Sequence, residues 1–237
     1  ATQRSGNRFL APAVLLAGLA IAGAVTRHGE MMRASRYGLY ASAALYVAMA
    51  LILSHGFLTH DFSNKYIAAY SDRSMPTLYL MAAFWGGEKG ALLLWTTALS
   101  IFGSIAIHSR REREPTYLSW AIATLALAIV FFDVLMVFES NPFEVFVTSA
   151  GPMDGKGLNP LLQNPTMAFH PPSLLTGYIT FTIPFAFGIA ALITGKLDSQ
   201  WIEDSRTWTI ISWCFLSVGL VLGALWAYQE LGWGFYW

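Results

Sequence analysis

The sequence predicts an all-α protein: a polytopic transmembrane bundle of about six helices, with interfacial segments between them. Its composition predicts this first. Hydrophobic residues make up 55% of the 237 residues and charged residues only 12%, about half of the ~25% usual in soluble domains. Mean hydropathy is +0.50, and long runs carry no charge. The formal net charge is zero, so no nucleic-acid partner is expected, and the expected surroundings are a lipid bilayer.

Six apolar runs predict the individual spans, because each approaches or exceeds the ~20 residues that cross a bilayer core as a helix. They are 9–25, 37–57, 78–107, 117–138, 174–194 and 207–228. The first lacks a small-residue cleavage site, so we expect a retained helix and no signal peptide. The third is too long for one span and contains the glycine-rich 85–90. We expect an interfacial turn there, followed by a helix over 90–107.

Lysine and arginine assign the two sides of the membrane. They concentrate in the loops after the first, third and fifth runs, which we therefore expect to face the cytoplasm: Arg27, Arg33, Arg36, Arg110, Arg111, Arg113, Lys196 and Arg206. The longer loops 58–77 and 139–173 contain few of them and are expected outside, as are both ends of the chain. No repeat or linker divides the sequence, so residues 1–237 form one predicted domain.

His170 is the most prominent candidate for chemistry. It lies in the predicted external loop 139–173, followed by Pro171 and Pro172, directly before the apolar run that begins at Leu174. Proline fixes φ and disfavours the α region in the residue before it, so we expect a stiff elbow here and not a helix. Neutral imidazole is a common metal ligand and axial ligand of haem iron. An interfacial histidine that only hydrogen-bonds a carbonyl is the alternative.

An aromatic segment over 225–237 could bind a planar ligand. Its rings alternate with glycines that allow close backbone approach. The residues are Trp226, Tyr228, Gly232, Trp233, Gly234, Phe235, Tyr236 and Trp237. A porphyrin face of roughly 300 Å² at about 25 cal/mol/Å² would contribute ~7 kcal/mol before association costs. Trp85, in the glycine turn, offers another flat face. The alternatives are an aromatic belt at the membrane surface and a turn that only caps the third span.

Asp133 lies inside the fourth predicted span, about six residues from its outer end and so ~9 Å deep. Intramembrane carboxylates are candidates for function. Hydration from the outer face and a role in proton transfer both remain open. Cys214 is the single cysteine, which excludes an internal disulfide. It lies in an apolar run and is expected to be a structural thiol.

Several motifs in order resemble the CcmF family, the haem lyase subunits of cytochrome c maturation system I. They are Trp85-Gly-Gly-Glu-Lys-Gly90 with Leu92-Leu-Leu-Trp95, Ser140-Asn-Pro-Phe143, Leu158-Asn-Pro-Leu-Leu-Gln163, Phe169-His-Pro-Pro172 and Gly177-Tyr178. Asp61-Phe-Ser63 and Tyr66 also fit. The segment 225–237 resembles the start of the tryptophan-rich WWD segment of haem-handling membrane proteins.

This resemblance implies a multi-pass protein of the bacterial inner membrane, or the mitochondrial one, with a haem b site on the periplasmic face. His170 would be one of two axial iron ligands, and the aromatic segment with Trp85 would hold the ring. Haem would arrive on the chaperone CcmE, and apocytochrome c with CcmH/CcmI-type partners. The two thiols of its CxxCH motif would then add across the haem vinyl groups. No catalytic residue is identified.

The same resemblance implies that the chain is the N-terminal part of a larger CcmF-like protein, whose remainder is a further partner. The second axial ligand would lie in that remainder, so this part alone is not expected to be catalytic. Four alternatives stay open: a haem exporter or handler of the CcmC or CcsA type, the paralogue that serves a nitrite reductase pathway, a b-haem membrane electron-transfer subunit, and a purely structural subunit of a split lyase.

Overall fold

The computed structural model describes residues 2–147 and 151–232, with side chains described from residue 10 onward. Its helices are α1 (Thr2–Thr26), α2 (Gly29–Leu58), α3 (Lys65–Tyr70), α4 (Thr77–Ala83), α5 (Glu88–Ser109), α6 (Pro115–Phe138), the 3-10 turn η1 (Pro160–Leu162), α7 (Pro165–Thr180), α8 (Thr182–Thr194) and α9 (Ser199–Glu230). The described residues form no β-sheet, and only an isolated bridge joins Asn64 to Val145.

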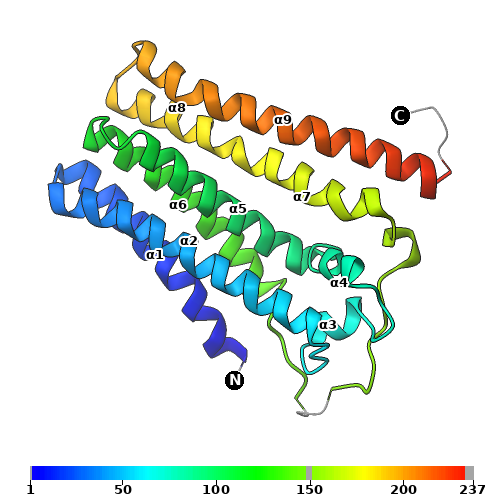
Figure 1. The fold of residues 1–237 in the computed structure, drawn as a ribbon. Coiled ribbons are helices and arrows are strands. Elements are labelled where there is room, and N and C mark those ends of the chain that lie inside the picture. The colour runs from blue at the N-terminus through cyan, green and yellow to red at the C-terminus, as the bar shows by residue number, and fades with distance from the viewer. Residues whose placement is uncertain (1, 148–150, 233–237) are drawn as a thin grey trace.

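The long helices form a membrane-spanning bundle (Figure 1). Five helical stretches in the described part are long and apolar enough to cross a bilayer: α2, α5, α6, α9, and α7 with α8 as one stretch of 30 residues. A further apolar helix over Leu10–Thr26 is shorter than these five. The prediction of a polytopic helical membrane protein with about six spans is therefore confirmed. The expected turn before the third span is also present, between α4 and α5.

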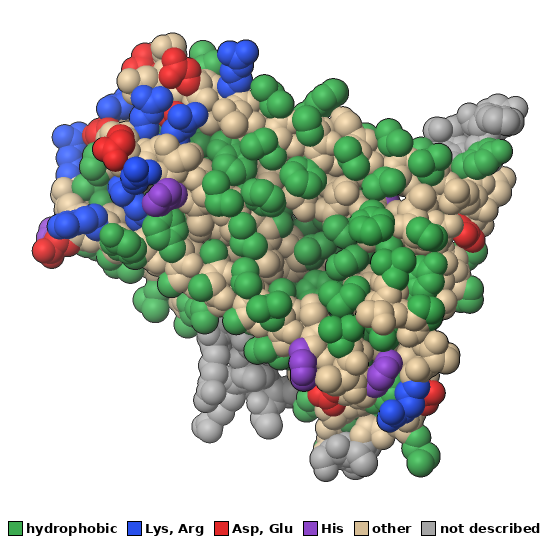
Figure 2. All heavy atoms as spheres, in the orientation of Figure 1, with side chains coloured by type: hydrophobic (Ala, Val, Ile, Leu, Met, Phe, Trp, Pro, Cys, Tyr) green, Lys and Arg blue, Asp and Glu red, His purple; other side chains and the backbone are tan. Residues whose placement is uncertain are grey.

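The three basic loops meet at one end of the bundle, as Figure 2 shows on its upper left. Asp204, which is fully buried, pairs with Arg110 Nε at 2.9 Å and with Arg113 at 3.0 Å. Lys196 pairs with Glu114, and this hydrogen bond holds the pKa of the Glu114 carboxyl below its usual range. Helix α1 begins and α9 ends away from these loops (Figure 1). The grouping of loops expected from the Lys and Arg pattern is thus present.

His170 does not lie at an elbow, and this part of the prediction was wrong. Helix α7 begins at Pro165, because the Asn164 side chain accepts a hydrogen bond from the backbone N–H of Thr166 at 2.8 Å. The helix then continues through Pro171 and Pro172 to Thr180. The loop predicted over 139–173 therefore ends at Asn164 and not at residue 173, and His170 lies in the second turn of a helix.

A side chain from another part of the chain compensates for one of these prolines. Pro172 has no N–H to give to the carbonyl of Ala168, four residues earlier. That carbonyl instead accepts the indole N–H of Trp85 at 3.1 Å. Ala168 is buried, so without this bond a main-chain acceptor would remain unpaired away from water. The glycine turn thus supports the proline-containing turns of α7.

We predict that Trp85→Phe lowers the free energy of unfolding by about 1–3 kcal/mol, the usual cost of an unpaired buried polar group. The phenyl ring keeps part of the packing and loses the N–H together with the rest of the five-membered ring. Thermal unfolding of the detergent-solubilised protein measures the change. Trp213→Phe is the matched control, because Trp213 is 62% exposed on α9. Equal midpoints for the two variants would contradict the role of this hydrogen bond.

Candidate functional site

The site begins with an unusually close approach of α7 to α9. A Cβ atom added at Gly219 would lie 2.5 Å from the backbone nitrogen of Leu174 and 2.6 Å from its Cα. A Cβ at Gly177 would collide with the backbone of Leu216 on the facing helix. Glycine at both positions is therefore required for this spacing, as in other membrane helix pairs whose backbones touch.

The close approach brings His170 against the backbone of α9. Its Nδ1 lies 2.7 Å from the carbonyl oxygen of Gly219. A carbonyl only accepts hydrogen bonds, so Nδ1 carries the proton and the lone pair of the neutral imidazole is on Nε2. Nε2 has no hydrogen-bond partner among the described residues. A histidine held by its protonated nitrogen, with the other nitrogen free, has the form that binds a metal.

Trp226 adds an aromatic wall beside this imidazole. The two rings are inclined by only 20°, with centroids 6.1 Å apart. The indole N–H of Trp226 donates to the carbonyl of Leu161 at 2.8 Å, which fixes the ring against the segment before α7. The structure therefore brings together two of the residues expected to bind a planar ligand.

An open, mostly apolar cavity of about 480 Å³ lies at these two residues. Its volume is in the ordinary range for small-molecule sites. It is lined by His170, Leu220, Val221, Gly223, Ala224, Trp226, Ala227 and Leu231. The described residues contain no group of three or more His, Cys, Asp or Glu that could hold a metal ion. A metal bound here would therefore need most of its ligands from elsewhere. The iron of a porphyrin meets this condition, because the ring supplies four nitrogen ligands.

The outer ends of α7 and α9 are tied together next to the cavity. The side-chain amide of Asn164, which caps α7, donates to Gln229 Oε1 at 3.0 Å and to Glu230 Oε1 at 2.8 Å. Asn164 is buried. The same side chain therefore starts one helix and joins it to the last turn of the other, so the two walls of the cavity are held at a fixed distance.

The other expected site residues have different positions. Trp85 is partly buried, and its N–H binds Ala168, so it supports α7 and does not line the cavity. Gly232 follows α9 with φ of 65°, a left-handed conformation that ends helices. The remaining four lie outside the described residues: Trp233, Gly234, Tyr236 and Trp237.

Asp133, the other candidate from the sequence, is separate from this cavity. Its side chain is fully buried within the bundle, where Oδ2 accepts the hydroxyl proton of Tyr46 at 2.7 Å. Oδ1 has no partner among the described residues. The bond joins α6 to α2, so the carboxyl contributes at least to the packing of these two helices.

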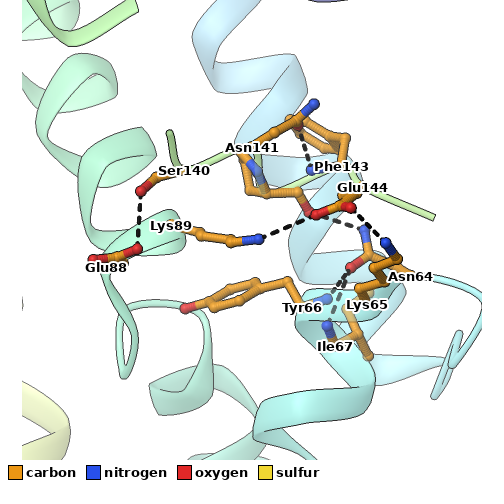
Figure 3. Close-up of polar contacts among 11 residues, drawn as sticks. Asn64, Lys65, Tyr66, Ile67, Glu88, Lys89, Ser140, Asn141, Phe143 and Glu144 are labelled. Atoms are coloured by element: carbon orange, nitrogen blue, oxygen red, sulfur yellow. Dashed lines mark hydrogen bonds and ion pairs between the residues drawn. The ribbon is translucent and has the colours of Figure 1, made fainter. Parts of the chain in front are cut away.

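A polar network that we did not predict from the sequence holds the outer segments together (Figure 3). Glu144, in the segment after α6, contacts the ammonium groups of Lys65 and, at 3.4 Å, Lys89. The hydrogen bond from Lys65 lowers the pKa of the Glu144 carboxyl. Ser140 donates to Glu88 at 2.9 Å. Three segments distant in sequence are thus joined beside the glycine turn, and no local spacing in the sequence could have indicated these pairs.

Tyr66 fixes the glycine turn itself. Its hydroxyl accepts the backbone N–H of Gly87 at 3.1 Å and donates to the carbonyl of Phe84 at 3.0 Å. Burial raises the pKa of Tyr66, so the hydroxyl keeps the proton that it donates. Gly90 is required in the same turn, because a Cβ there would collide with the carbonyl of Phe84. Tyr66 therefore holds the turn in which Trp85 lies.

We predict that acid loosens this outer network. Because the pKa of Glu144 is lowered in the folded protein, its stabilising contribution is complete above the unfolded value of ~4.3. The contribution is lost as the pH falls through the folded value. Amide hydrogen exchange of residues 61–70, corrected for intrinsic rates, should therefore show lower protection at about pH 3 than at about pH 7.

Glu144→Gln should remove this pH dependence, and Glu112→Gln should not, since Glu112 is an exposed residue at the basic end. An unchanged pH profile in Glu144→Gln would contradict the role of the carboxylate.

Known proteins resemble this chain over almost its full length. The family model described as Cytochrome C assembly protein matches residues 85–237. The cytochrome c-type biogenesis protein CcmF of Haemophilus influenzae is 40% identical over 232 residues, which is 96% of this chain and 35% of that protein. CcmF of Escherichia coli K12 is 38% identical over 95% of this chain and 35% of its own length.

A further relative and a solved structure also match this chain. The cytochrome c-type biogenesis protein NrfE of H. influenzae is 39% identical over 78% of this chain and 29% of that protein. A solved structure of the cytochrome c haem lyase CcmF superposes with a TM-score of 0.81 and 29% identity, over 100% of this chain and 38% of that one. The chain thus spans about a third of the length of these relatives.

Proposed function

Because this chain belongs to the cytochrome c assembly protein family, we propose that it supplies the haem-binding half-site of a cytochrome c haem lyase. One observation carries the proposal. Among the described residues, Nε2 of His170 has no hydrogen-bond partner, and it lies beside a mostly apolar cavity with an aromatic wall. The matched region of the family model includes every residue of this cavity.

The residues present fit haem as the substrate. Haem offers two large apolar faces and an iron that accepts neutral imidazole as an axial ligand. The cavity offers apolar side chains from α9, the indole of Trp226 and one correctly protonated imidazole. We infer that His170 binds the iron and that Trp226 packs beside the ring. Gly232, Trp233, Gly234, Tyr236 and Trp237 would extend the platform, as the start of a WWD segment.

The role of these residues in the reaction is to hold and orient haem b. Each thiol of a CxxCH motif adds across one vinyl group: its sulfur bonds one vinyl carbon and its proton ends on the other. Holding the ring with its vinyl groups toward the thiols supplies proximity and orientation. The proposal assigns binding residues to this chain and no acid or base. The second axial ligand would come from the part of the relatives that this chain does not span.

The proposed location is the bacterial inner membrane, or the mitochondrial one. With the basic loops in the cytoplasm, the cavity lies on the periplasmic side. That side suits delivery of haem by a CcmE-type chaperone and of apocytochrome c by CcmH/CcmI-type proteins. Support for this orientation comes from the eight Lys and Arg residues of the three loops. One of these loops precedes the start of α9 at Ser199, whereas the cavity is lined by the last turns of the same helix.

We predict that His170→Ala, in the membrane complex that contains this chain, lowers haem occupancy by at least about tenfold. Even indirect partners of metal ligands are worth ~10–100-fold in affinity. The absorption spectrum of the purified complex and the yield of holocytochrome c measure the loss. His55→Ala is the matched control, because His55 is exposed on α2. A spectrum and yield identical to those of the unchanged protein would remove His170 as the ligand.

A further inference from the structure

Gly223 lies directly beneath the imidazole of His170. A Cβ added at Gly223 would lie 2.5 Å from Cε1, 2.7 Å from Nδ1 and 3.2 Å from Nε2 of that ring. These three nearest atoms all belong to one side chain. At Gly177 and Gly219, in contrast, an added Cβ would collide with the backbone of the facing helix. Glycine at 223 therefore makes room for the imidazole, and glycine at the other two makes room for the helix.

The room at Gly223 determines which hydrogen bond the imidazole makes. The carbonyl of Gly219 lies one helical turn before Gly223 and has a second lone pair beyond the one used within α9. His170 reaches this oxygen at 2.7 Å with its ring against the α9 backbone, where a side chain at 223 would stand. This bond keeps the proton on Nδ1, so it also determines where the lone pair of Nε2 points.

Trp226 limits the ring from a further direction. It is three residues after Gly223 on the same helix, and its ring is nearly parallel to the imidazole. Its own orientation is fixed by the bond to Leu161. The imidazole therefore occupies the space left by Gly223, between the carbonyl of Gly219 and the indole of Trp226. All three residues lie on α9.

We propose that Gly223 is a positioning residue for the His170 ligand: its lack of a side chain lets the Gly219 carbonyl hold Nδ1–H and so directs Nε2 toward the metal of a planar tetrapyrrole. This inference rests on the proposed function. It adds that the backbone of the facing helix orients the imidazole. In many metal sites a second side chain, such as a carboxylate, orients the histidine ligand instead.

The first test is Gly223→Ala in the native membrane complex. The added methyl group displaces the ring, so we expect haem affinity to fall by about tenfold. The remaining haem should lose the spectrum of an imidazole-bound iron. Gly188→Ala is the matched control, because an added Cβ there meets nothing within 4 Å. Alanine has the higher helix propensity at both positions, so a purely local effect would not weaken binding.

A double-variant comparison separates positioning from general helix packing. If Gly223 acts through His170, Gly223→Ala causes no further loss of haem in a His170→Ala background. An equal additional loss in both backgrounds would overturn the inference. The outcomes are distinct: an unaffected His170→Ala variant rejects the proposed ligand itself, and an unaffected Gly223→Ala variant beside an impaired His170→Ala variant rejects only the positioning role.

If the Gly223→Ala variant does not fold well enough to be purified, rescue by free imidazole tests the positioning role of Gly223. In His170→Gly, added imidazole should occupy the vacated space and restore the imidazole-bound spectrum. In His170→Gly/Gly223→Ala, the methyl group fills part of that space, so about tenfold more imidazole should be required. Equal rescue of the two variants would show that Gly223 does not shape the ligand position.

Discussion

The contact between α7 and α9 is the interaction on which the rest of this site depends. Backbone meets backbone at Gly177 and Gly219, so the two helices are closer than side chains would normally allow. Only at this separation can the imidazole of His170 reach a main-chain carbonyl of the other helix. The contact thus determines the tautomer of the neutral imidazole, its direction and the position of the aromatic wall formed by Trp226.

A second set of contacts connects the outer segments to the same helix. Tyr66 holds the glycine turn through its main-chain groups, and Glu144 joins that turn to α3. From the turn, Trp85 reaches the carbonyl of Ala168, two residues before His170. The aromatic residue that we expected to face a ligand therefore has a supporting position. The charged groups at this end stabilise the site through hydrogen bonds and do not enter it.

The sequence predicted the spans and their grouping well, because length, hydropathy and Lys/Arg position are local properties that the membrane imposes on each segment. It did not predict the start of α7, because the preferences of Pro171 and Pro172 were considered without the indole donor of Trp85, which lies 83 residues before its acceptor Ala168. The start of α9 was placed at residue 207 and is at Ser199. Asp198, whose side chain accepts the N–H of Gln200, was a capping signal that we overlooked. The pairing of His170 with Gly219 has no signal in residue spacing, because spacing does not say which helices touch.

The prolines of α7 have a consequence for biosynthesis. The hydrogen-bond ladder of α7 is interrupted at its prolines, and Trp85, which is made earlier, donates to the freed carbonyl of Ala168. The carbonyl that orients the His170 ring belongs to Gly219, which is made 49 residues after the histidine. During translation the nascent segment therefore has no oriented imidazole until its final long helix has been inserted. A chain interrupted before that point would present His170 on a helix that lacks the partner that orients its ring.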